Sequence, residues 1–581
     1  MISIKNLSFA FPDKELYDDV SFSIERGQSL AFIGSSGSGK STLAEIILDD
    51  DKYMYDGKIE REDSYKIGFV SQFYDVDLSK EITVFEYIAQ DFVALEAKIH
   101  GLCEEMGTTD DLDEVMEEYQ KALDKSEAID GDNYENNINK KLNLANLFQQ
   151  KDLDISKLSG GEYKLIQVIK QMLTTPHFVI MDEPDAFLDF DNLKALRNLI
   201  NSYKGTMLTI THSRYLLNHC FNKILHLENK KIQEFEGNYI DYNFELLATK
   251  VELQELACRD TEEIERNKIM IDKLRTIATH HDAAANGRSL HARVTYAHRL
   301  EARRIKDPYI CVEQPEIILK AENVKAEETV LRVSDLDIAF EEVLMKDVNF
   351  EIKGTDKVAV IGANGTGKTS LIREIYKNSN PSITYGEDVT VSYLSQNQGE
   401  MFEENSSIYD AFFDLGFQTY DEISSYLLKF GFPEEKMNQK ISSLSGGEKN
   451  ILGLAKISNQ SSNFLILDEP ISHLDTYSQI ALEESIRNYN GALLMISHDF
   501  YSIVNCADYV LIIENQTVRK MQMRKFRKMI YASHFDKDYL QLEQSKKELE
   551  TKIEQALDKK DFESAKVLVE GLEEIITGMK N

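Results

Sequence analysis

Short apolar runs alternate with glycine-rich turns and longer mixed segments along this chain, which is the pattern of an α/β fold. The N-terminal segment MISIKNLSFAF alternates like a strand, and the runs SLAFI and KVAVI read as buried strands. Each of these two runs leads through glycines into a helix-like segment, TLAEII in one case and SLIREI in the other. The same strand, turn and helix therefore occur twice, and the pattern predicts two α/β domains in tandem.

The two glycine-rich turns both fit the pattern G-x-x-x-x-G-K-[ST]. Glycines at these positions let backbone N–H groups curve around phosphate oxygens at the start of a helix. The lysine then neutralises the outer phosphates, and the Ser or Thr hydroxyl binds magnesium. The phosphate-binding residues predicted from these loops are Gly34, Gly37, Gly39, Lys40, Ser41 and Thr42 in the first, and Gly362, Gly365, Gly367, Lys368, Thr369 and Ser370 in the second.

Further elements follow each loop in the same order. They are a glutamine after a strand-like run (Gln72, Gln396), a Ser-Gly-Gly-Glu segment opening a helix (Ser159, Gly160, Gly161; Ser445, Gly446, Gly447), two acids ending a strand (Asp182, Glu183; Asp468, Glu469), a Leu-Asp pair (Asp189; Asp475) and a histidine after another strand (His212; His498).

Together these residue types supply what ATP hydrolysis requires. The aspartate can hold magnesium, the glutamate can orient and deprotonate water, the histidine can contact the γ-phosphate and the glutamine can sense it. The expected catalytic residues are Glu183, Glu469, His212 and His498, and the expected magnesium ligands are Ser41, Gln72, Asp182, Thr369, Gln396 and Asp468. An acidic pair at a strand end is usually a solvated loop, but the complete order in both halves favours the chemical interpretation.

Composition and charge exclude several other classes of protein. The chain has 581 residues and a net charge of −34, which discourages nucleic-acid binding except at local basic patches. Its five cysteines are scattered without C-x-x-C spacing, which argues against disulfides, structural zinc and iron–sulfur clusters. No apolar run approaches the ~18 residues of a membrane-spanning helix, and the N-terminus does not resemble a targeting segment. We therefore expect a cytoplasmic protein.

Each half of the chain resembles an ABC-type ATPase domain, because LSGGE is the signature of that superfamily. In that family ATP binds between the phosphate loop of one domain and the LSGGE of the other. The resemblance therefore implies one site from Lys40 with Ser445 and another from Lys368 with Ser159, with ATP and Mg²⁺ as cofactors. It also implies that Phe11 and Phe340 contact adenine, although either could equally be a core residue. We expect both sites to hydrolyse ATP.

The segments outside the repeated elements distinguish this chain from other ATPases. We expect ATPase domains at 1–243 and 327–520, an acidic helical insertion at about 91–150, a helical hairpin linker at 244–326 and a helical extension at 521–581. The linker turns basic near its predicted tip, where RNA contact is expected from Arg288, Arg293, Arg299, Arg303, Arg304 and Lys306. The alternative is a hairpin whose bases pair with its own acids. The C-terminal helices either add a contact or pack on the protein.

The linker length, the sequence FEGNYIDY and the stretch NGRSLHARVTYAHRLE resemble ABC-F proteins, the ATPases that act on ribosomes. The resemblance implies binding to the ribosome in the ATP-bound state, with the linker directed at large-subunit rRNA, peptidyl-tRNA and the peptidyl-transferase centre. It implies a monomer without membrane contact. The family's usual DEPTNHLD is DEPDAFLD in the first half and DEPISHLD in the second, and the arginine often found after LSGGE is absent. These departures leave the catalytic acids intact.

Three alternatives stay open from sequence alone. Within the ABC-F class, the role is either antibiotic resistance by ribosome protection or a translation factor that relieves stalling. Outside it, the chain could be the energy module of a membrane transporter, although a basic hairpin has no obvious role there. DNA-repair ATPases come third. They carry long coiled coils or zinc modules inside one domain, whereas this sequence has only 142 positions from Lys40 to Asp182 and no zinc-binding spacing.

Overall fold

The computed structural model describes residues 2–12, 14–61, 67–72, 82–107, 112–175, 177–186, 188–280, 291–296, 299, 315–339, 343–413, 415–534 and 539–580. The chain forms two compact units. The first unit consists of a first half, Met1–Asn238, and a second half, Glu313–Ile530. The second unit consists of Tyr239–Val312 and Tyr531–Asn581.

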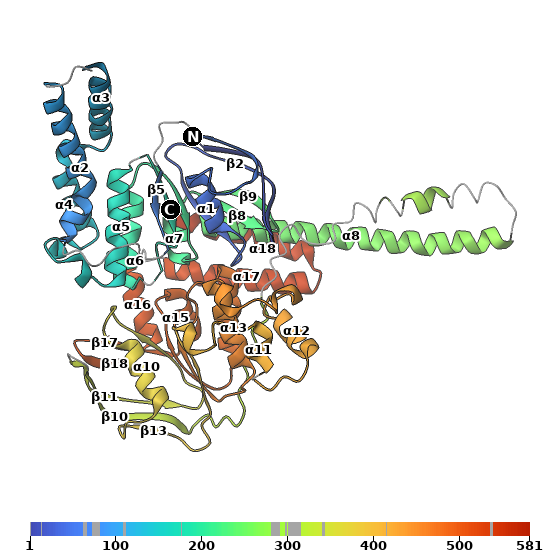
Figure 1. Cartoon of the computed structure of the whole chain (residues 1–581). Helices are drawn as coiled ribbons and strands as arrows, with labels where there is room; N and C mark the ends of the chain where they lie inside the picture. Colours follow the sequence, from blue (N-terminus) through green and yellow to red (C-terminus); the bar gives the residue numbers. More distant parts are fainter. Residues whose placement is uncertain are drawn as a thin grey trace. The chain divides into compact units, whose positions relative to one another are not determined.

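Each half is built around a six-stranded sheet in which five strands are parallel and one edge strand is antiparallel (Figure 1). In the first half the spatial order is β5 (Ile67–Val70), β6 (Phe178–Asp182), β7 (Thr206–Ile210), β3 (Ser29–Gly34), β8 (Lys223–Glu228) and β9 (Lys231–Glu236). In the second half it is β14 (Val391–Leu394), β15 (Phe464–Asp468), β16 (Ala492–Ile496), β12 (Lys357–Ile361), β17 (Tyr509–Glu514) and β18 (Thr517–Gln522). The matching order confirms the predicted α/β fold with an internal repeat.

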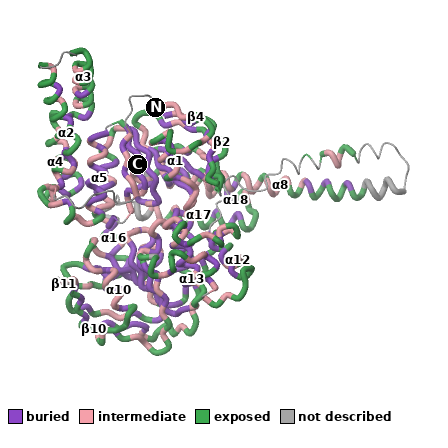
Figure 2. Tube along the Cα trace, in the orientation of Figure 1, coloured by how far each residue is buried: buried purple, intermediate pink, exposed green. Residues whose placement is uncertain are grey.

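A small antiparallel sheet accompanies each main sheet. Its strands are β2 (Lys14–Ile24), β1 (Ile2–Phe11) and β4 (Asp56–Arg61) in the first half, and β11 (Val343–Lys353), β10 (Thr329–Ala339) and β13 (Ile383–Tyr385) in the second. Side chains from both sheets share one hydrophobic core in each half, around Leu30 and Phe32 in the first and Val358 and Val360 in the second. Figure 2 shows this burial along the central strands. Burial on both faces explains why the strands read as continuous apolar runs.

Helices flank the sheets of both halves. Those of the first half are α1 (Lys40–Leu48), α2 (Val84–Glu105), α3 (Leu112–Ala128), α4 (Tyr134–Leu144), α5 (Gly160–Thr174), α6 (Phe190–Ser202) and α7 (Arg214–His219). Those of the second half are α10 (Lys368–Lys377), α11 (Ile408–Phe413), α12 (Tyr420–Leu428), α13 (Gly446–Ser458), α14 (Thr476–Asn488), α15 (Phe500–Cys506) and α16 (Met523–His534). The predicted acidic insertion falls on α2, α3 and α4, where α2 and α3 pack through Phe92, Leu95 and Ala122.

The second unit is helical. It contains the long α8 (Tyr239–His280), the helical residues 291–296, and the pair α17 (Tyr539–Asp558) and α18 (Phe562–Lys580). Ile553 and Leu557 of α17 and Leu572 of α18 are buried in one cluster with Val251 of α8. The C-terminal helices therefore pack on the start of the linker, which favours the second of the two alternatives expected from the sequence. Most of the return arm of the hairpin lies outside the described residues.

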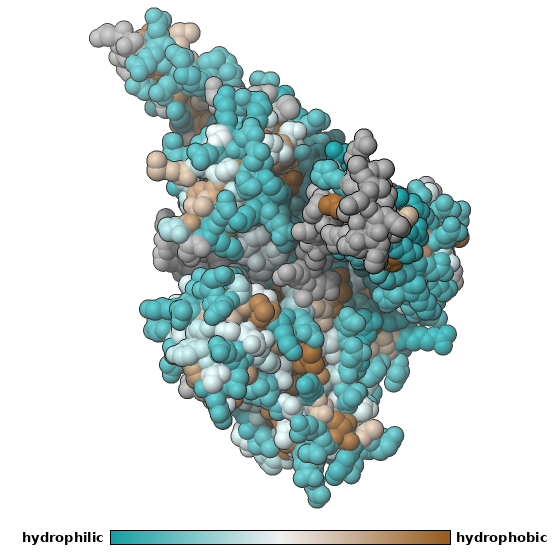
Figure 3. Space-filling model, turned by 90° about the vertical axis from the view of Figure 1, so that its right-hand side faces the viewer, coloured by the Kyte–Doolittle hydropathy of each residue, from teal (hydrophilic) through white to brown (hydrophobic). Residues whose placement is uncertain are grey.

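The face drawn in Figure 3 is largely hydrophilic, with small separated hydrophobic patches. In the described part of the chain, no helix combines the length and the apolar character needed to cross a membrane. The domain boundaries expected from the sequence stay predictions.

Candidate nucleotide-binding sites

Both phosphate-loop patterns form a turn between a buried strand and a helix, as predicted. The first joins β3 to α1 and the second joins β12 to α10. Gly39 and Gly367 precede the helices with φ values of 108° and 91°, a left-handed conformation that disfavours side chains. A Cβ at Gly39 would lie 2.8 Å from the Tyr17 hydroxyl oxygen, so the space also requires glycine. The other predicted residues of each motif lie at the end of the strand, in the turn, or in the first turn of the helix that follows.

The lysine of each loop is buried and bonded to its own loop. Lys40 Nζ donates to the carbonyls of Gly34 at 3.0 Å and Ser35 at 2.9 Å. Lys368 Nζ donates to the carbonyls of Gly362 and Ala363, both at 2.8 Å. Burial lowers the pKa of both lysines, with nearby carboxylates opposing this effect. A bound anion would therefore compensate a charge that the protein has partly removed from water.

Each phosphate loop faces the signature segment of the opposite half. The Ser36 amide donates to the Asp475 carboxylate at 2.9 Å, and the Ser36 and Ser445 hydroxyl oxygens are 3.4 Å apart. In the matching place, the Asn364 amide donates to the Asp189 carboxylate at 3.1 Å. We call the arrangement with Lys40 and Ser445 the first site, and that with Lys368 and Ser159 the second site.

Capping boxes set the direction of the signature helices. Ser159 caps α5 and Ser445 caps α13, and in both cases a glutamate three residues later bonds back to the cap backbone. The free N–H groups and the positive dipole end of each helix thus lie at a composite site. This is the geometry that the S-x-x-E pattern predicts.

The aspartate that ends each acidic strand has the environment expected of a magnesium ligand. Asp182 lies beside the Ser41 hydroxyl, and the Thr369 hydroxyl donates to Asp468 at 3.5 Å. Burial raises the pKa of both aspartates to about 6. One buried oxygen of each carboxylate has no hydrogen-bond partner among the described residues. A carboxylate beside a hydroxyl offers the oxygen ligands that Mg²⁺ prefers, so Asp182 with Ser41 and Asp468 with Thr369 would hold the ion.

The glutamates that follow these aspartates, Glu183 and Glu469, have similar backbone conformations but different pKa values. Both have left-handed backbone conformations, with φ of 44° for Glu183 and 51° for Glu469. Burial raises the pKa of Glu183, but the hydrogen bond from His473 and the charges of His212 and Lys40 lower it to about 2. Burial, together with Asp468, raises the pKa of Glu469 to about 8.

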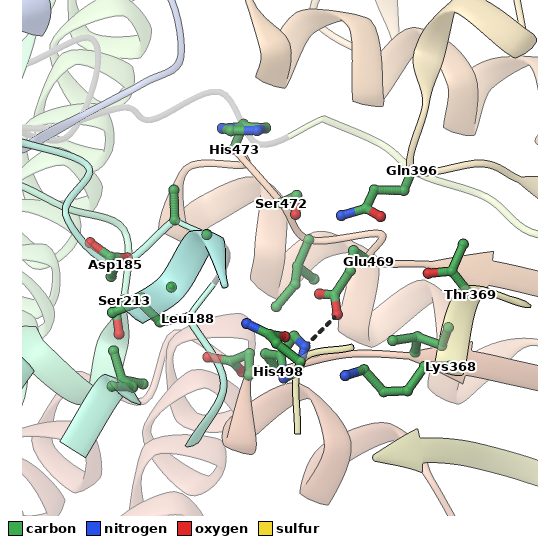
Figure 4. A pocket seen from close by; sticks show the side chains of 18 of the residues that line it. Asp185, Leu188, Ser213, Lys368, Thr369, Gln396, Glu469, Ser472, His473 and His498 are labelled. Carbon is green, nitrogen blue, oxygen red and sulfur yellow. Dashed lines mark ion pairs between the residues drawn. The ribbon is translucent and has the colours of Figure 1, made fainter. Parts of the chain in front are cut away.

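The histidine that follows each neighbouring strand is buried near its glutamate. His498 Nε2 lies 3.5 Å from Glu469 Oε1, the pair joined by a dashed line in Figure 4. Burial, with a smaller effect of the nearby lysine, lowers the pKa of both His212 and His498 to about 4. Both imidazoles are therefore neutral at pH 7, and each can donate one hydrogen bond to a phosphate oxygen.

A cavity of about 520 Å³ lies between the halves and includes the second site. Figure 4 shows Lys368, Thr369 and Gln396 on one wall, with Glu469 and His498 beside them. The signature residues Ser159, Gly160 and Gly161 of the first half also line it. A volume in the usual range of ligand pockets and a lining from both halves suit a nucleotide.

Several predicted residues lie elsewhere or outside the described part of the chain. Phe11 is 38% exposed at the end of β1 and contacts Phe9 and Tyr53 edge to face. Phe340 lies outside the described residues, as do Arg288, Arg303, Arg304 and Lys306. Arg293 donates to Asn267 of α8 at 3.1 Å, and Arg299 is exposed. The roles assigned to these residues stay predictions.

Sequence reasoning missed residues that hold the sites together. Lys164 of α5 donates to the carbonyls of Ser71 and Gln72, the latter at 3.1 Å. His473 reaches the first site from the second half, and Arg214 pairs with Glu483 and Asp499 across the halves. The signal for His473 was the difference between DEPISHLD, which keeps the histidine of DEPTNHLD, and DEPDAFLD, which has Phe187 in its place. The other contacts join residues far apart along the chain and leave no local signal.

The fold and the paired sites define a tandem P-loop ATPase. A sequence model of the family described as ABC transporter matches residues 17–186 and 345–472, just over half of the chain. The chain belongs to this family and, within it, is a tandem ABC ATPase of the ABC-F type that hydrolyses ATP.

Similar proteins support this assignment. "ABC transporter F family member 5" of Arabidopsis thaliana is 28% identical, and the match covers 88% of this chain and 75% of that protein. "Energy-dependent translational throttle protein EttA" of Mycobacterium tuberculosis is also 28% identical, over 88% of this chain and 90% of the relative. A solved structure of the archaeal ribosome recycling factor aABCE1, in complex with the archaeal ribosomal stalk protein aP1, shares the fold with a TM-score of 0.54 and 17% identity, covering 89% and 90% of the two chains.

Proposed function

We propose that this chain is a ribosome-associated ATPase that binds the ribosome while ATP joins its two halves, and that leaves after hydrolysis. The observation that carries the proposal is that each phosphate loop contacts the opposite half, through the aspartate of its Leu-Asp pair (Asp475 or Asp189) and, at the first site, through the signature serine Ser445. A nucleotide bound at such a site touches both halves and therefore favours their association. The names of the similar proteins, a translational throttle and a ribosome recycling factor, support ribosomes as the partner.

The residues of each site have distinct roles in this proposal. Lys40 and Lys368 bind the outer phosphates, and the signature serines hold the γ-phosphate from the other side. Asp182 and Asp468 hold magnesium, which neutralises charge on the phosphate oxygens. In their ionised forms Glu183 and Glu469 orient the attacking water and accept its proton, and the neutral His212 and His498 donate to the γ-phosphate. Unpartnered carboxylate oxygens on both aspartates support this assignment.

The linker supplies the RNA contact. The long α8 ends at His280, and from there to Lys306 the sequence has six bases against two acids, Asp282 and Glu301. A local basic patch on a chain of net charge −34 confines phosphate binding to one element. We infer that this stretch reaches toward large-subunit rRNA and the peptidyl-tRNA near the peptidyl-transferase centre.

Replacing both glutamates tests the ATP-dependent cycle. The double variant Glu183→Gln, Glu469→Gln should bind ATP without cleaving it, because the amide keeps the shape but cannot accept the proton. Pelleting through a sucrose cushion should then find it on ribosomes with ATP and absent without ATP. The exposed Glu60→Gln, which removes the same charge from β4, is the matched control and should behave like the parent. Pelleting with membranes instead would favour the transporter alternative.

A second comparison tests the linker. Arg293→Gln with Arg299→Gln, in the double-glutamine background, should weaken ribosome binding and reduce its dependence on salt. The control is Arg259→Gln with Arg266→Gln on α8, where both arginines pair with glutamates four residues earlier. An equal loss for both pairs would contradict a role for the basic stretch. Growth of a sensitive host against ribosome-targeting antibiotics separates a resistance role from that of a translation factor.

A further inference from the structure

One side chain crosses from the second half into the first site. His473 lies between β15 and α14, and its Nδ1 is 3.1 Å from Glu183 Oε2. Gln72 Nε2 donates to the same oxygen at 2.7 Å. Among the described residues, both hydrogen bonds to this carboxylate end on Oε2, so Oε1 is the oxygen that can accept from a water.

The loop that carries His473 is held tightly in place. Asn450, buried in α13, donates through Nδ2 to the carbonyls of Pro470 at 2.8 Å and Ser472 at 3.0 Å. A Cβ on Gly447 would come within 2.5 Å of the His473 carbonyl oxygen, so the loop lies directly against the signature helix. His473 itself has φ of 61°, a strained conformation for a residue with a side chain. Such strain persists where the surroundings determine the conformation.

The second site is built differently. The position matching His473 in the first half is Phe187, whose side chain can neither donate a hydrogen bond nor carry charge. The position matching Asn450 is Lys164, which bonds to the carbonyls of Ser71 and Gln72 rather than to its own acidic-strand loop. Gln396 lines the cavity, but no hydrogen bond joins it to Glu469 in the part of the chain that the structure describes. Oε1 of Glu469 makes no hydrogen bond there, and its polar neighbour is Nε2 of His498 in the same half, 3.5 Å away.

We propose that His473 is a positioning residue for the Glu183 carboxylate, and that the two sites are therefore unequal, the first hydrolysing ATP faster than the second. This inference rests on the proposed role of the two glutamates. Phosphoryl transfer requires little covalent assistance, so a carboxylate that holds the attacking water in line contributes mainly through orientation. Two side chains donate to Glu183, and one of them, His473, belongs to the opposite half, whereas among the described residues Glu469 has only His498 of its own half beside it.

Single-site backgrounds test this inference in the full chain. Glu469→Gln leaves hydrolysis to the first site, and Glu183→Gln leaves it to the second. In the Glu469→Gln background, His473→Ala should lower kcat about 10-fold with little change in the KM for ATP, because orientation acts on the chemical step. His473→Gln, which keeps a donor, should restore most of the loss. In the Glu183→Gln background, the His473→Ala loss should be less than about 2-fold.

Each outcome is decisive. An equal fall of kcat in both backgrounds, or a rise of KM with kcat unchanged, would show that His473 acts only as structural support and would overturn the inference. An unchanged kcat in the Glu469→Gln background would overturn it as well. Hydrolysis by the double variant Glu183→Gln, Glu469→Gln would instead refute the proposed role of the glutamates, whatever His473 does.

Discussion

A buried ion pair joins the two halves of the first unit and offers a quantitative test of their association. Arg214 of α7 pairs with Glu483 of α14 and, at 2.9 Å, with Asp499. The Arg214 and Glu483 side chains are only 9% and 5% exposed. Ser502 and Asn505 donate to Glu483 at 2.6 and 2.8 Å, so its charge is fully hydrogen-bonded.

Replacing Arg214 by Met keeps most of the side-chain volume but leaves two carboxylates, the buried Glu483 and the partly buried Asp499, without their cation. Breaking a buried pair from one side costs about 3–5 kcal/mol. Urea unfolding followed by circular dichroism measures this loss as a change in the first unfolding transition. The control is Glu60→Gln in the exposed pair between Lys5 and Glu60, which should cost less than about 1 kcal/mol.

Adding Glu483→Gln to Arg214→Met removes one of the stranded charges. The double variant should therefore be more stable than Arg214→Met alone, because the two residues are coupled. Two observations would refute this reasoning: a cost for Arg214→Met no larger than that of the exposed control, or losses for the two single variants that simply add.

Two further predictions follow from the same structure. Burial raises the pKa of Glu483, but Arg214 and the hydrogen bonds together outweigh burial. The pKa of Glu483 therefore lies below its ordinary value of 4.5. Its ionisation therefore stabilises the fold above pH 4.5 and this contribution is lost as the pH falls through the lowered value, so Glu483→Gln should flatten the acid limb of a stability–pH curve. In the second unit, Ile553→Ala should cost about 2–5 kcal/mol of helix docking, seen as faster hydrogen exchange in α17 and α18. Val567→Ala on the exposed face of α18 is the control, and equal exchange in both variants would contradict the buried contact.

The elements of each site could be predicted from the sequence because their signals are local. The glycine loops, the apolar strands before them and the S-x-x-E caps at Ser159 and Ser445 all lie within a few residues. Their structures follow from backbone sterics and orphan N–H groups at helix starts. The order of the repeated elements then gave the α/β fold, since parallel strands with crossover helices have few allowed topologies.

The contacts between the halves could not be predicted in the same way. Arg214 and Glu483 are 269 residues apart, and His473 and Glu183 are 290 apart. Periodicity and local motifs carry no information about pairs at that separation. Arg214 also has Phe500 at the matching position of the second half, so the internal repeat does not reveal it. Only the three-dimensional structure, in which the two halves are in contact, shows which residues form such pairs.

The repeat and its exceptions together explain how two similar sites can act differently. In both halves the glutamate amide donates to the neighbouring strand, Glu183 to Ile210 at 2.9 Å and Glu469 to Ile496 at 3.1 Å. The backbone therefore places the carboxylates of Glu183 and Glu469 at equivalent positions in the two halves. Their surroundings differ, because His473 of the opposite half bonds to Glu183, and the residue that matches His473 in the sequence of the first half is a phenylalanine, Phe187, which lies outside the described residues. His473 lies two residues before Asp475, which accepts from the Ser36 amide of the facing phosphate loop, so the contact between the halves at the first site and the orientation of Glu183 depend on the same short loop.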